Sequence, residues 1–216
     1  MDRFSIIESV AAALPEADVD TDVIFPARFL LLLDKSGLGK HLFHERRYRD
    51  GRTTDFVLNT PPYDRARILV AGKNFGSGSS REQAVWALAD FGIRCVIAPS
   101  FGEIFYNNCF KNGVLPIVLT GDRHARVISA AASAEQMKID LDAQQISRST
   151  GSPLPFDIDP YRRRTLLLGL DEIGAILADD AADIEAFETT QRDTYPWVQI
   201  DDAALDRLFE KKVETR

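Results

Sequence analysis

Cysteine is scarce in this sequence. The 216 residues include two cysteines, Cys95 and Cys109, and neither belongs to a Cys-x-x-Cys pair. Small secreted scaffolds held together by disulfides need more cysteines than this, so we interpret both as free thiols. Because iron–sulfur clusters are held by several thiolates, the count also excludes a cluster bound by this chain alone. We predict no metal site in the chain.

Basic residues are outnumbered by acidic ones. The chain has 26 lysines and arginines against 33 aspartates and glutamates, a formal net charge of −7 and a sequence pI of about 5.0. Domains that bind nucleic acid concentrate basic side chains on one face. The basic runs here, such as 162–164, are short, and such runs usually form solvated or carboxylate-paired faces. We predict no nucleic-acid partner.

Long apolar runs are also lacking. The longest lie around Phe29–Leu33 and Leu166–Leu170, whereas a helix that spans a membrane needs about 20 apolar residues. Glu8 interrupts any apolar core of a secretory signal near the N-terminus. We therefore expect no membrane partner and a cytoplasmic protein.

Apolar strands and helices alternate regularly between residues 68 and 119. Gly92 and Gly113 follow the two predicted helices and suit the left-handed residue that ends many helices. Continuous apolar strands are typical of a sheet covered on both faces, and helices between them indicate parallel strands. The predicted elements are strands Ile68–Ala71, Cys95–Ala98 and Leu115–Leu119 and helices at about 80–91 and 103–112.

The rest of the chain completes the predicted architecture. Residues 136–141 and 144–148 have the pattern of an antiparallel hairpin. We predict an α/β fold, with a mixed sheet built on the β-α-β-α-β core. One domain should cover residues 1–190, and 191–216 should form a helical C-terminal extension with a charged amphipathic segment at Asp202–Val213.

The loop between the strand at 68–71 and the helix that follows it is rich in glycine and serine. Ser79 and Glu82 fit a capping box at the start of the helix. A cap does not explain Gly76-Ser77-Gly78, which predicts that something approaches the backbone closely. Arg81 would lie in the first helical turn, where the helix dipole disfavours a cation, so we predict an anionic ligand beside it.

Nucleotide-binding and esterase patterns do not fit this loop. It lacks the Lys-Ser or Lys-Thr pair of a P-loop, and Arg81 stands at the last glycine position of a dinucleotide fingerprint. No serine is flanked as in a nucleophile elbow. A carboxylate remains as the ligand, and a serine at the helix start beside an arginine could lose its proton and act as a base.

An acidic segment before the core admits two interpretations. Asp18, Asp20 and Asp22 would share one side of an extended chain. Taken alone, the residues favour a solvated acidic loop that caps the next element over a carboxylate aimed into a site.

Two further segments also admit two interpretations each. The run Phe29–Leu33 fits either core or a loop that lines an apolar pocket, with Gly37 and Gly39 allowing movement. His41 and His44 have the spacing of two metal ligands on one helical face, but no third ligand is near in sequence, so packing is the better interpretation.

Ordered motifs along the chain resemble one family. Asn74–Glu82 is similar to the signature of the swivel domain of the aconitase superfamily, and the chain to about residue 190 resembles the small subunits of bacterial 3-isopropylmalate dehydratases. The resemblance implies a single swivelling β/β/α domain of the aconitase C-terminal type. The supporting segments are 20–24, 39–43, 71–88, 96–101, 104–108 and 169–174.

The resemblance also implies a reaction shared between two chains. A separate large subunit would carry a [4Fe-4S] cluster, with no cofactor in this chain, and the two would form a heterodimer or heterotetramer acting on a small dicarboxylate. Together they would isomerise 2-isopropylmalate and 3-isopropylmalate by dehydration and rehydration through isopropylmaleate, a step of leucine biosynthesis.

Site residues follow from the family's motifs. By position, Ser79 matches the base and Arg81 the clamp for a substrate carboxylate. Asp22 matches an active-site carboxylate, which reverses the preference for a solvated loop at that residue. The positions that match substrate-binding residues are Ser77, Gly78 and Ser80 in the glycine loop and Phe29, Leu30, Leu31 and Leu32 in the specificity loop.

Substrate choice depends on the specificity loop. Relatives that act on tricarboxylates carry an arginine where Leu31 stands, so the resemblance implies an apolar substituent such as isopropyl. A methylmalate/citraconate or dimethylmaleate hydratase stays an alternative, because one methylene discriminates only ~10–200-fold. A non-catalytic carboxylate-binding module is a further alternative. Ser77 replaces a cysteine of many members, and the segment after about residue 191 is longer than usual.

Overall fold

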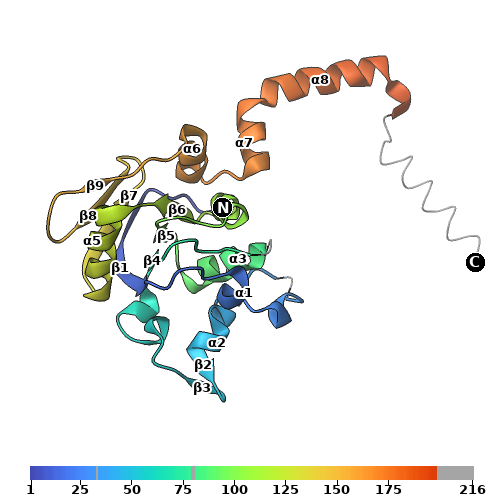
Figure 1. Ribbon diagram of the computed structural model, residues 1–216. Helices are drawn as coiled ribbons and strands as arrows, with labels where there is room; N and C mark the ends of the chain where they lie inside the picture. Colours follow the sequence, from blue (N-terminus) through green and yellow to red (C-terminus); the bar gives the residue numbers. More distant parts are fainter. Residues whose placement is uncertain (33, 79–80, 199–216) are drawn as a thin grey trace, which may run out of the picture. The chain divides into compact units, whose positions relative to one another are not determined.

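The computed structural model describes residues 1–32, 34–78 and 81–198. Contacts group Met1–Asp171 into one compact unit and the chain from Glu172 onward into a second. The first unit is built on a seven-stranded sheet in the order β6-β5-β4-β1-β7-β8-β9 (Figure 1). Its strands are β1 (Ile6–Leu14), β4 (Ile68–Ala71), β5 (Cys95–Ala98), β6 (Leu115–Val118), β7 (Gln136–Asp140), β8 (Gln145–Arg148) and β9 (Leu154–Pro155).

The sheet is mixed, and β1 is where its direction changes. On one side β1 pairs with β4 in parallel, and β4, β5 and β6 continue in parallel. On the other side β1 pairs antiparallel with β7, and β7, β8 and β9 continue antiparallel. The predicted β-α-β-α-β core and the predicted hairpin are therefore confirmed within one sheet. The helices of the core are α3 (Glu82–Phe91) and α4 (Glu103–Lys111).

Both faces of β4 and β5 are buried. Because side chains alternate along a strand, Leu69 and Ala71 of β4 enter one apolar cluster, whereas Ile68 and Val70 enter another. The first cluster includes α3 and α4, and the second includes α5 (Gly121–Ala132). This explains why these strands are apolar at every position.

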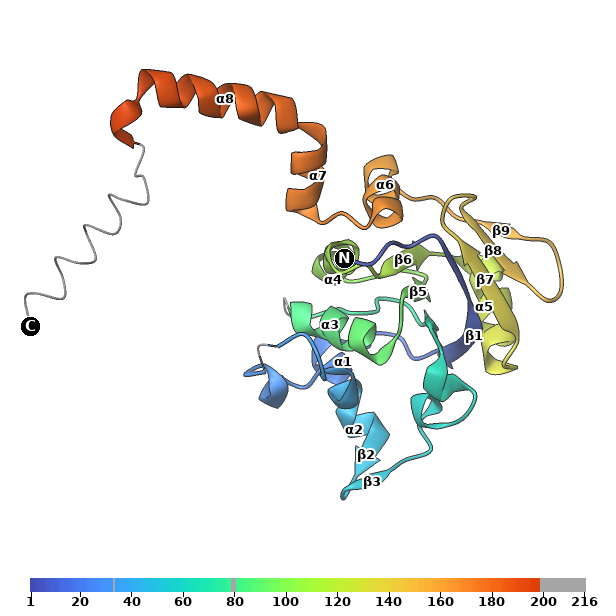
Figure 2. The same ribbon diagram turned by 180° about the vertical axis from the view of Figure 1, so that it is seen from behind.

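Smaller elements complete the first unit. A two-stranded ribbon, β2 (Tyr48–Arg49) and β3 (Arg52–Thr53), lies next to α2, apart from the large sheet (Figures 1 and 2). The short α-helices are α1 (Thr21–Ile24), α2 (His44–Arg47) and α6 (Pro160–Leu168). The 3₁₀ turns are η1 (Ala27–Phe29), η2 (Gly39–His41), η3 (Val57–Asn59) and η4 (Tyr63–Arg65).

Glycine ends α3 as predicted. Gly92 has φ +110, and its N–H donates to the carbonyls of Leu88 and Ala89. The left-handed region is costly for residues with a Cβ, so a glycine there stops the helix cheaply.

The second unit is helical where the structure describes it. It consists of α7 (Glu172–Asp179), which contacts α8 (Ala181–Thr194), and η5 (Pro196–Val198). The domain boundary at residue 190 stays a prediction, and the amphipathic segment Asp202–Val213 lies outside the described residues. No helix in the described part of the chain is long and apolar enough to cross a membrane.

Candidate active site

The glycine-rich loop leaves the carboxyl end of β4 and leads into α3, and two other loops hold it in place. The Gly76 N–H donates to the Val19 carbonyl at 2.7 Å, and the Thr21 N–H donates to the Ser77 carbonyl at 2.9 Å. The Phe75 N–H donates to the Ser100 carbonyl at 3.1 Å. The loop is thus fastened to the segment after β1 and to the segment after β5, at the sheet edge where open α/β proteins bind ligands.

Packing explains one of the loop glycines. Gly76 has φ +72, and a Cβ there would clash with the ring of Phe105. Phe105 itself packs edge-on against Phe75, with ring centroids 5.4 Å apart. The predicted close approach to the backbone is therefore confirmed at Gly76, where the approaching group is a side chain of the same chain. Gly78 differs, because it has φ +93 but only loose neighbours, the closest being Asp20 Cβ at 3.5 Å.

The start of α3 differs from the capping-box prediction. The helix begins at Glu82, and Arg81 is its N-cap, with extended backbone and no side-chain capping bond. The Glu82 carboxylate accepts from Trp86 Nε1 at 3.2 Å and from Asn112 Nδ2 at 2.9 Å. Glu82 is therefore engaged with α3 and the end of α4. Ser79 and Ser80, the predicted base and its neighbour, lie outside the described residues.

Asp22 and Arg81 form an ion pair. Asp22 Oδ1 accepts from Arg81 Nη1 and also from the backbone N–H of Ala27, at 2.8 Å for the second bond. The Arg81 side chain is 19% exposed, and the Asp22 side chain is 55% exposed. The hydrogen bond from Arg81, followed by that from Ala27, holds the pKa of the Asp22 carboxyl below its usual value. The structure thus brings together two of the three predicted catalytic residues.

Asp22 reaches this position because the acidic segment is not extended throughout. Asp20 is the N-cap of α1, and its Oδ1 accepts from the Asp22 and Val23 N–H groups at 2.9 and 2.8 Å. The expectation of three aspartates on one side of an extended chain is therefore wrong. Asp20 instead fits the expectation that this acidic segment caps the next element, since aspartate is a preferred N-cap residue.

The predicted specificity loop divides into packed and exposed parts. Phe29 and Leu30 are partly buried and pack against the first apolar cluster. Leu31 is 90% exposed and Leu32 is 40% exposed. Leu33 lies outside the described residues. One end of the leucine run therefore contributes to the core, and the other presents apolar side chains to solvent. The assignment of residues 29–32 to a specificity loop stays a prediction.

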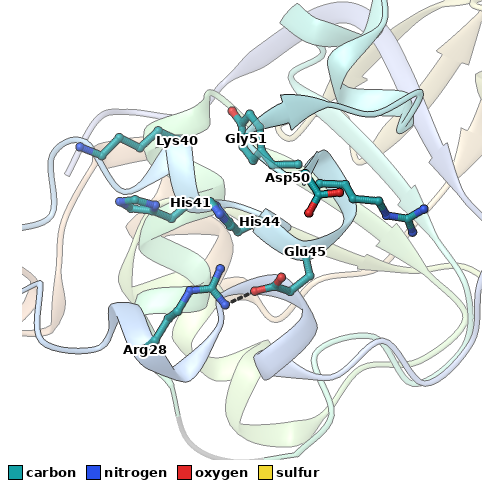
Figure 3. A pocket seen from close by; sticks show the side chains of 9 residues that line it. Arg28, Lys40, His41, His44, Glu45, Asp50 and Gly51 are labelled. Carbon is teal, nitrogen blue, oxygen red and sulfur yellow. Dashed lines mark hydrogen bonds and ion pairs between the residues drawn. The ribbon is translucent and has the colours of Figure 1, made fainter.

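Two cavities adjoin this region. One, of about 350 Å³, is lined by Asp22, Ala27, Arg28 and Glu45 among others. The other, of about 600 Å³, is lined by His41 and His44 and shares Arg28 and Glu45, which form an ion pair (Figure 3). In the described part of the chain no three His, Cys, Asp or Glu side chains lie close enough to hold a metal ion.

Comparison with known proteins gives this geometry a context. The family model of the aconitase C-terminal domain matches residues 1–122. The chain is 52% identical over 200 residues to the 3-isopropylmalate dehydratase small subunit of Granulibacter bethesdensis, covering 91% of this chain and 96% of that protein. The chain belongs to the family of 3-isopropylmalate dehydratase small subunits.

Further relatives agree with this family. The 3-isopropylmalate dehydratase small subunit of Parvibaculum lavamentivorans is 50% identical over 202 residues, covering 92% of this chain and all of that protein. The crystal structure of 3-isopropylmalate dehydratase from Methanocaldococcus jannaschii superposes with a TM-score of 0.63 at 29% identity, covering 84% of this chain and 99% of that one. The fold and the family predicted from the sequence are confirmed.

Proposed function

We propose that this small subunit forms one side of a shared active site and supplies to it a serine base and an arginine that binds a substrate carboxylate. A large subunit forms the other side, and the pair isomerises 2-isopropylmalate and 3-isopropylmalate. The observation that carries the proposal is the placement of Arg81, a largely buried guanidinium at the N-cap of α3 oriented by Asp22.

Arg81 suits a carboxylate for two reasons. An arginine has five N–H donors in a planar fork, so the bond from Nη1 to Asp22 leaves donors for a second carboxylate. The first N–H groups of α3 have no intrahelical acceptor and carry the positive end of the helix dipole. A substrate carboxylate placed there meets a guanidinium and backbone donors already in position, which reduces the entropy cost of orienting it.

The base is Ser79 in this proposal. It precedes Arg81 by two residues, so an alkoxide on Ser79 would lie near the guanidinium and the start of α3, where negative charge is stabilised. Ser79 would take a proton from the carbon beside a substrate carboxylate, while the hydroxyl leaves the adjacent carbon and a double bond forms. Return of the proton to one carbon and of a hydroxyl to the other, at exchanged positions, completes the isomerisation.

This chain's own thiols do not fit an iron–sulfur cluster. Cys95 and Cys109 are fully buried in β5 and α4, and burial raises the pKa of both thiols, whereas cluster ligands are thiolates. We therefore assign a [4Fe-4S] cluster to the large subunit, where it would act as a Lewis acid on the leaving hydroxyl. We propose a heterodimer or heterotetramer, and the cytoplasm stays the predicted compartment.

The substituent of the substrate meets the leucine loop in this proposal. Residues 29–32 contain no charged side chain, which disfavours a third substrate carboxylate and favours isopropyl. The exposed Leu31 would become buried when substrate and large subunit are bound, and burying a leucine side chain contributes about 2 kcal/mol. A methylmalate, citraconate or dimethylmaleate hydratase is the second candidate, because a leucine-lined pocket also accepts a smaller apolar group.

The test is reconstitution with the large subunit. The full chain should be co-expressed with a large-subunit chain and assayed on isopropyl- and methyl-substituted diacids by absorbance of the unsaturated product. Ser79→Ala should assemble normally but lose about 10²–10⁴-fold in turnover, while Ser133→Ala, an exposed serine after α5, should behave as wild type. Unchanged turnover in Ser79→Ala would reject the base assignment, and binding without turnover in the wild type would favour a carboxylate-binding module.

A further inference from the structure

The predicted specificity loop is connected to the active-site pair through a short run of turns. Phe29 N–H donates to the Pro26 carbonyl at 3.0 Å, and Leu30 N–H donates to the Ala27 carbonyl at 3.1 Å. Leu32 N–H donates in turn to the Phe29 carbonyl at 3.0 Å. Because Leu32 bonds to the backbone of Phe29, a movement of Phe29 is passed on to the leucines that follow it.

The first residue of η1, Ala27, is held by Asp22. The Ala27 N–H donates to Asp22 Oδ1, the same oxygen that pairs with Arg81. The position of residues 30–32 therefore also depends on what holds Phe29, the last residue of η1.

The Phe29 ring is enclosed by aromatic and cationic side chains. Its face stacks on His41, with ring centroids 4.0 Å apart and planes 20° from parallel. His44 meets it edge-on at 5.0 Å, and the guanidinium of Arg28 lies 4.6 Å from its centroid. The stack with His41 has the shortest centroid distance of any ring pair in the described residues.

His41 is itself fixed against α3. The Gly39 N–H at the start of η2 donates to Asp90 Oδ2 at 2.7 Å, and the Gly39 carbonyl accepts from Arg47 Nη1 at 2.9 Å. A Cβ on Gly39 would lie 2.6 Å from the Phe91 amide nitrogen, so η2 rests directly on the end of the helix. Arg81 therefore lies at the N-terminal end of α3. The turn η2, which carries His41, lies against the C-terminal end of the same helix.

Burial and the neighbouring positive charges both favour the neutral form of His41. Burial, followed by Lys40, His44 and Arg28, lowers the pKa of His41 below its usual value. Burial, followed by Arg28 and then Arg47, also lowers the pKa of His44, and Glu45 opposes this. Above its lowered pKa the imidazole is an uncharged flat ring, which a phenyl ring can replace. Both histidines line the 600 Å³ cavity (Figure 3).

We propose that His41 is a positioning residue for substrate choice: its imidazole, stacked on Phe29, sets where residues 30–32 lie and so determines the preference for the substrate's apolar substituent. This inference rests on the proposed function, because it assigns residues 30–32 to that same site. His41 touches neither substrate nor cluster in this assignment and acts only through Phe29.

The experiment compares His41→Ala, which removes the ring, with His41→Phe, which keeps a flat ring that can stack. Each full chain is reconstituted with the large subunit, and kcat/KM is measured for an isopropyl-substituted and a methyl-substituted malate. His41→Ala should reduce the ratio of the two values about threefold to tenfold, mainly through KM, and His41→Phe should restore it. Lys40→Ala, an exposed neighbour on η2, should leave the ratio unchanged and controls for disturbance of the turn.

A double-mutant cycle tests whether the effect passes through Phe29. Phe29→Leu combined with His41→Ala should lose no more selectivity than Phe29→Leu alone, because the two residues act as one unit. Additive losses would overturn the proposal. An unchanged ratio in His41→Ala would overturn it as well.

Methyl NMR of the isolated full chain separates this proposal from the proposed function. The methyl signals of Leu30, Leu31 and Leu32 should shift in His41→Ala and return in His41→Phe. Unshifted signals would overturn the positioning role even in the absence of any activity measurement. Inactivity of the reconstituted wild type on both substrates would instead overturn the proposed function, with the NMR comparison still deciding whether His41 positions the loop.

Discussion

Asp22 and Arg81 are 59 residues apart in the chain, yet the carboxylate in the first turn of α1 accepts from the guanidinium at the N-cap of α3. The same carboxylate oxygen accepts from the Ala27 N–H at the start of η1. One oxygen thus connects the proposed carboxylate clamp with the segment that leads into the proposed specificity loop. We propose on this basis that Asp22 orients Arg81 before substrate arrives.

Asp22→Asn should reduce catalysis more than it reduces stability. The amide keeps an acceptor for Ala27 but loses the charge that orients Arg81, so we expect kcat/KM of the reconstituted enzyme to fall about tenfold to a hundredfold, by analogy with other losses of charge-assisted positioning. The measurement is steady-state kinetics with the large subunit in excess. Asp142→Asn is the matched control, because it breaks another exposed Asp–Arg pair, with Arg163. Equal kinetics in the two variants would argue against an orienting role.

The contribution of Asp22 to stability should depend on pH in the acid range. The pKa of Asp22 is lowered in the folded state, first by the hydrogen bond from Arg81. The ionised form therefore stabilises the fold above the unfolded pKa of about 4. This contribution is lost as pH falls through the folded pKa.

Urea unfolding of wild type and Asp22→Asn between pH 7 and pH 3 measures this dependence. The difference in free energy of unfolding should be constant from pH 7 to about pH 5 and should shrink below about pH 4. It should be small throughout, since the side chain is more than half exposed. A difference that grows on acidification would contradict the lowered pKa.

Gly76→Ala should destabilise the fold by about 2–4 kcal/mol. The added Cβ meets both the left-handed backbone and the ring of Phe105, so strain and overpacking act together. Gly92→Ala is a matched control, because Gly92 also has positive φ but no atom lies within 4 Å of its Cβ position. Gly92→Ala should lower the free energy of unfolding by about 1 kcal/mol. Chemical denaturation compares the two, and equal losses would show that backbone strain alone is responsible.

The two cysteines should not react in the native protein. Cys95 and Cys109 are both fully buried, and burial raises the pKa of each thiol. Thiolate is the reactive form, so a chromogenic disulfide reagent should titrate no thiol at neutral pH and two per chain in denaturant. Rapid reaction of one thiol without denaturant would contradict this burial.

Much of the fold could be predicted because its signals are local. The apolar runs predicted at 68–71, 95–98 and 115–119 contain the parallel strands β4, β5 and β6, and Gly92 ended α3 as predicted. Burial on both faces of a strand leaves a continuous apolar run, and a helix end needs a residue that tolerates positive φ. The family could be predicted as well, because its motif around Asn74–Glu82 is contiguous in sequence.

Details of the loop could not be predicted, because they depend on distant side chains. Gly76 is required by Phe105, which comes from α4, and the sequence predicted a close approach there without naming the group that makes it. Glu82 has the sequence position of a capping-box residue, yet α3 begins at Glu82 itself, and Trp86 and Asn112 donate to its carboxylate. The stack of His41 on Phe29 has no sequence signal, since neither residue belongs to a periodic pattern that joins them.

The sequence by itself therefore determined the order of strands and helices, the family, and the residue types available at the glycine loop. Only the tertiary structure decided which side chains meet there: Asp22 with Arg81, Gly76 with Phe105, and His41 with Phe29. The physical reason is that secondary structure and burial depend on near neighbours and their periodicity, whereas each of these pairs joins segments that come together only when the sheet and its connecting loops have formed.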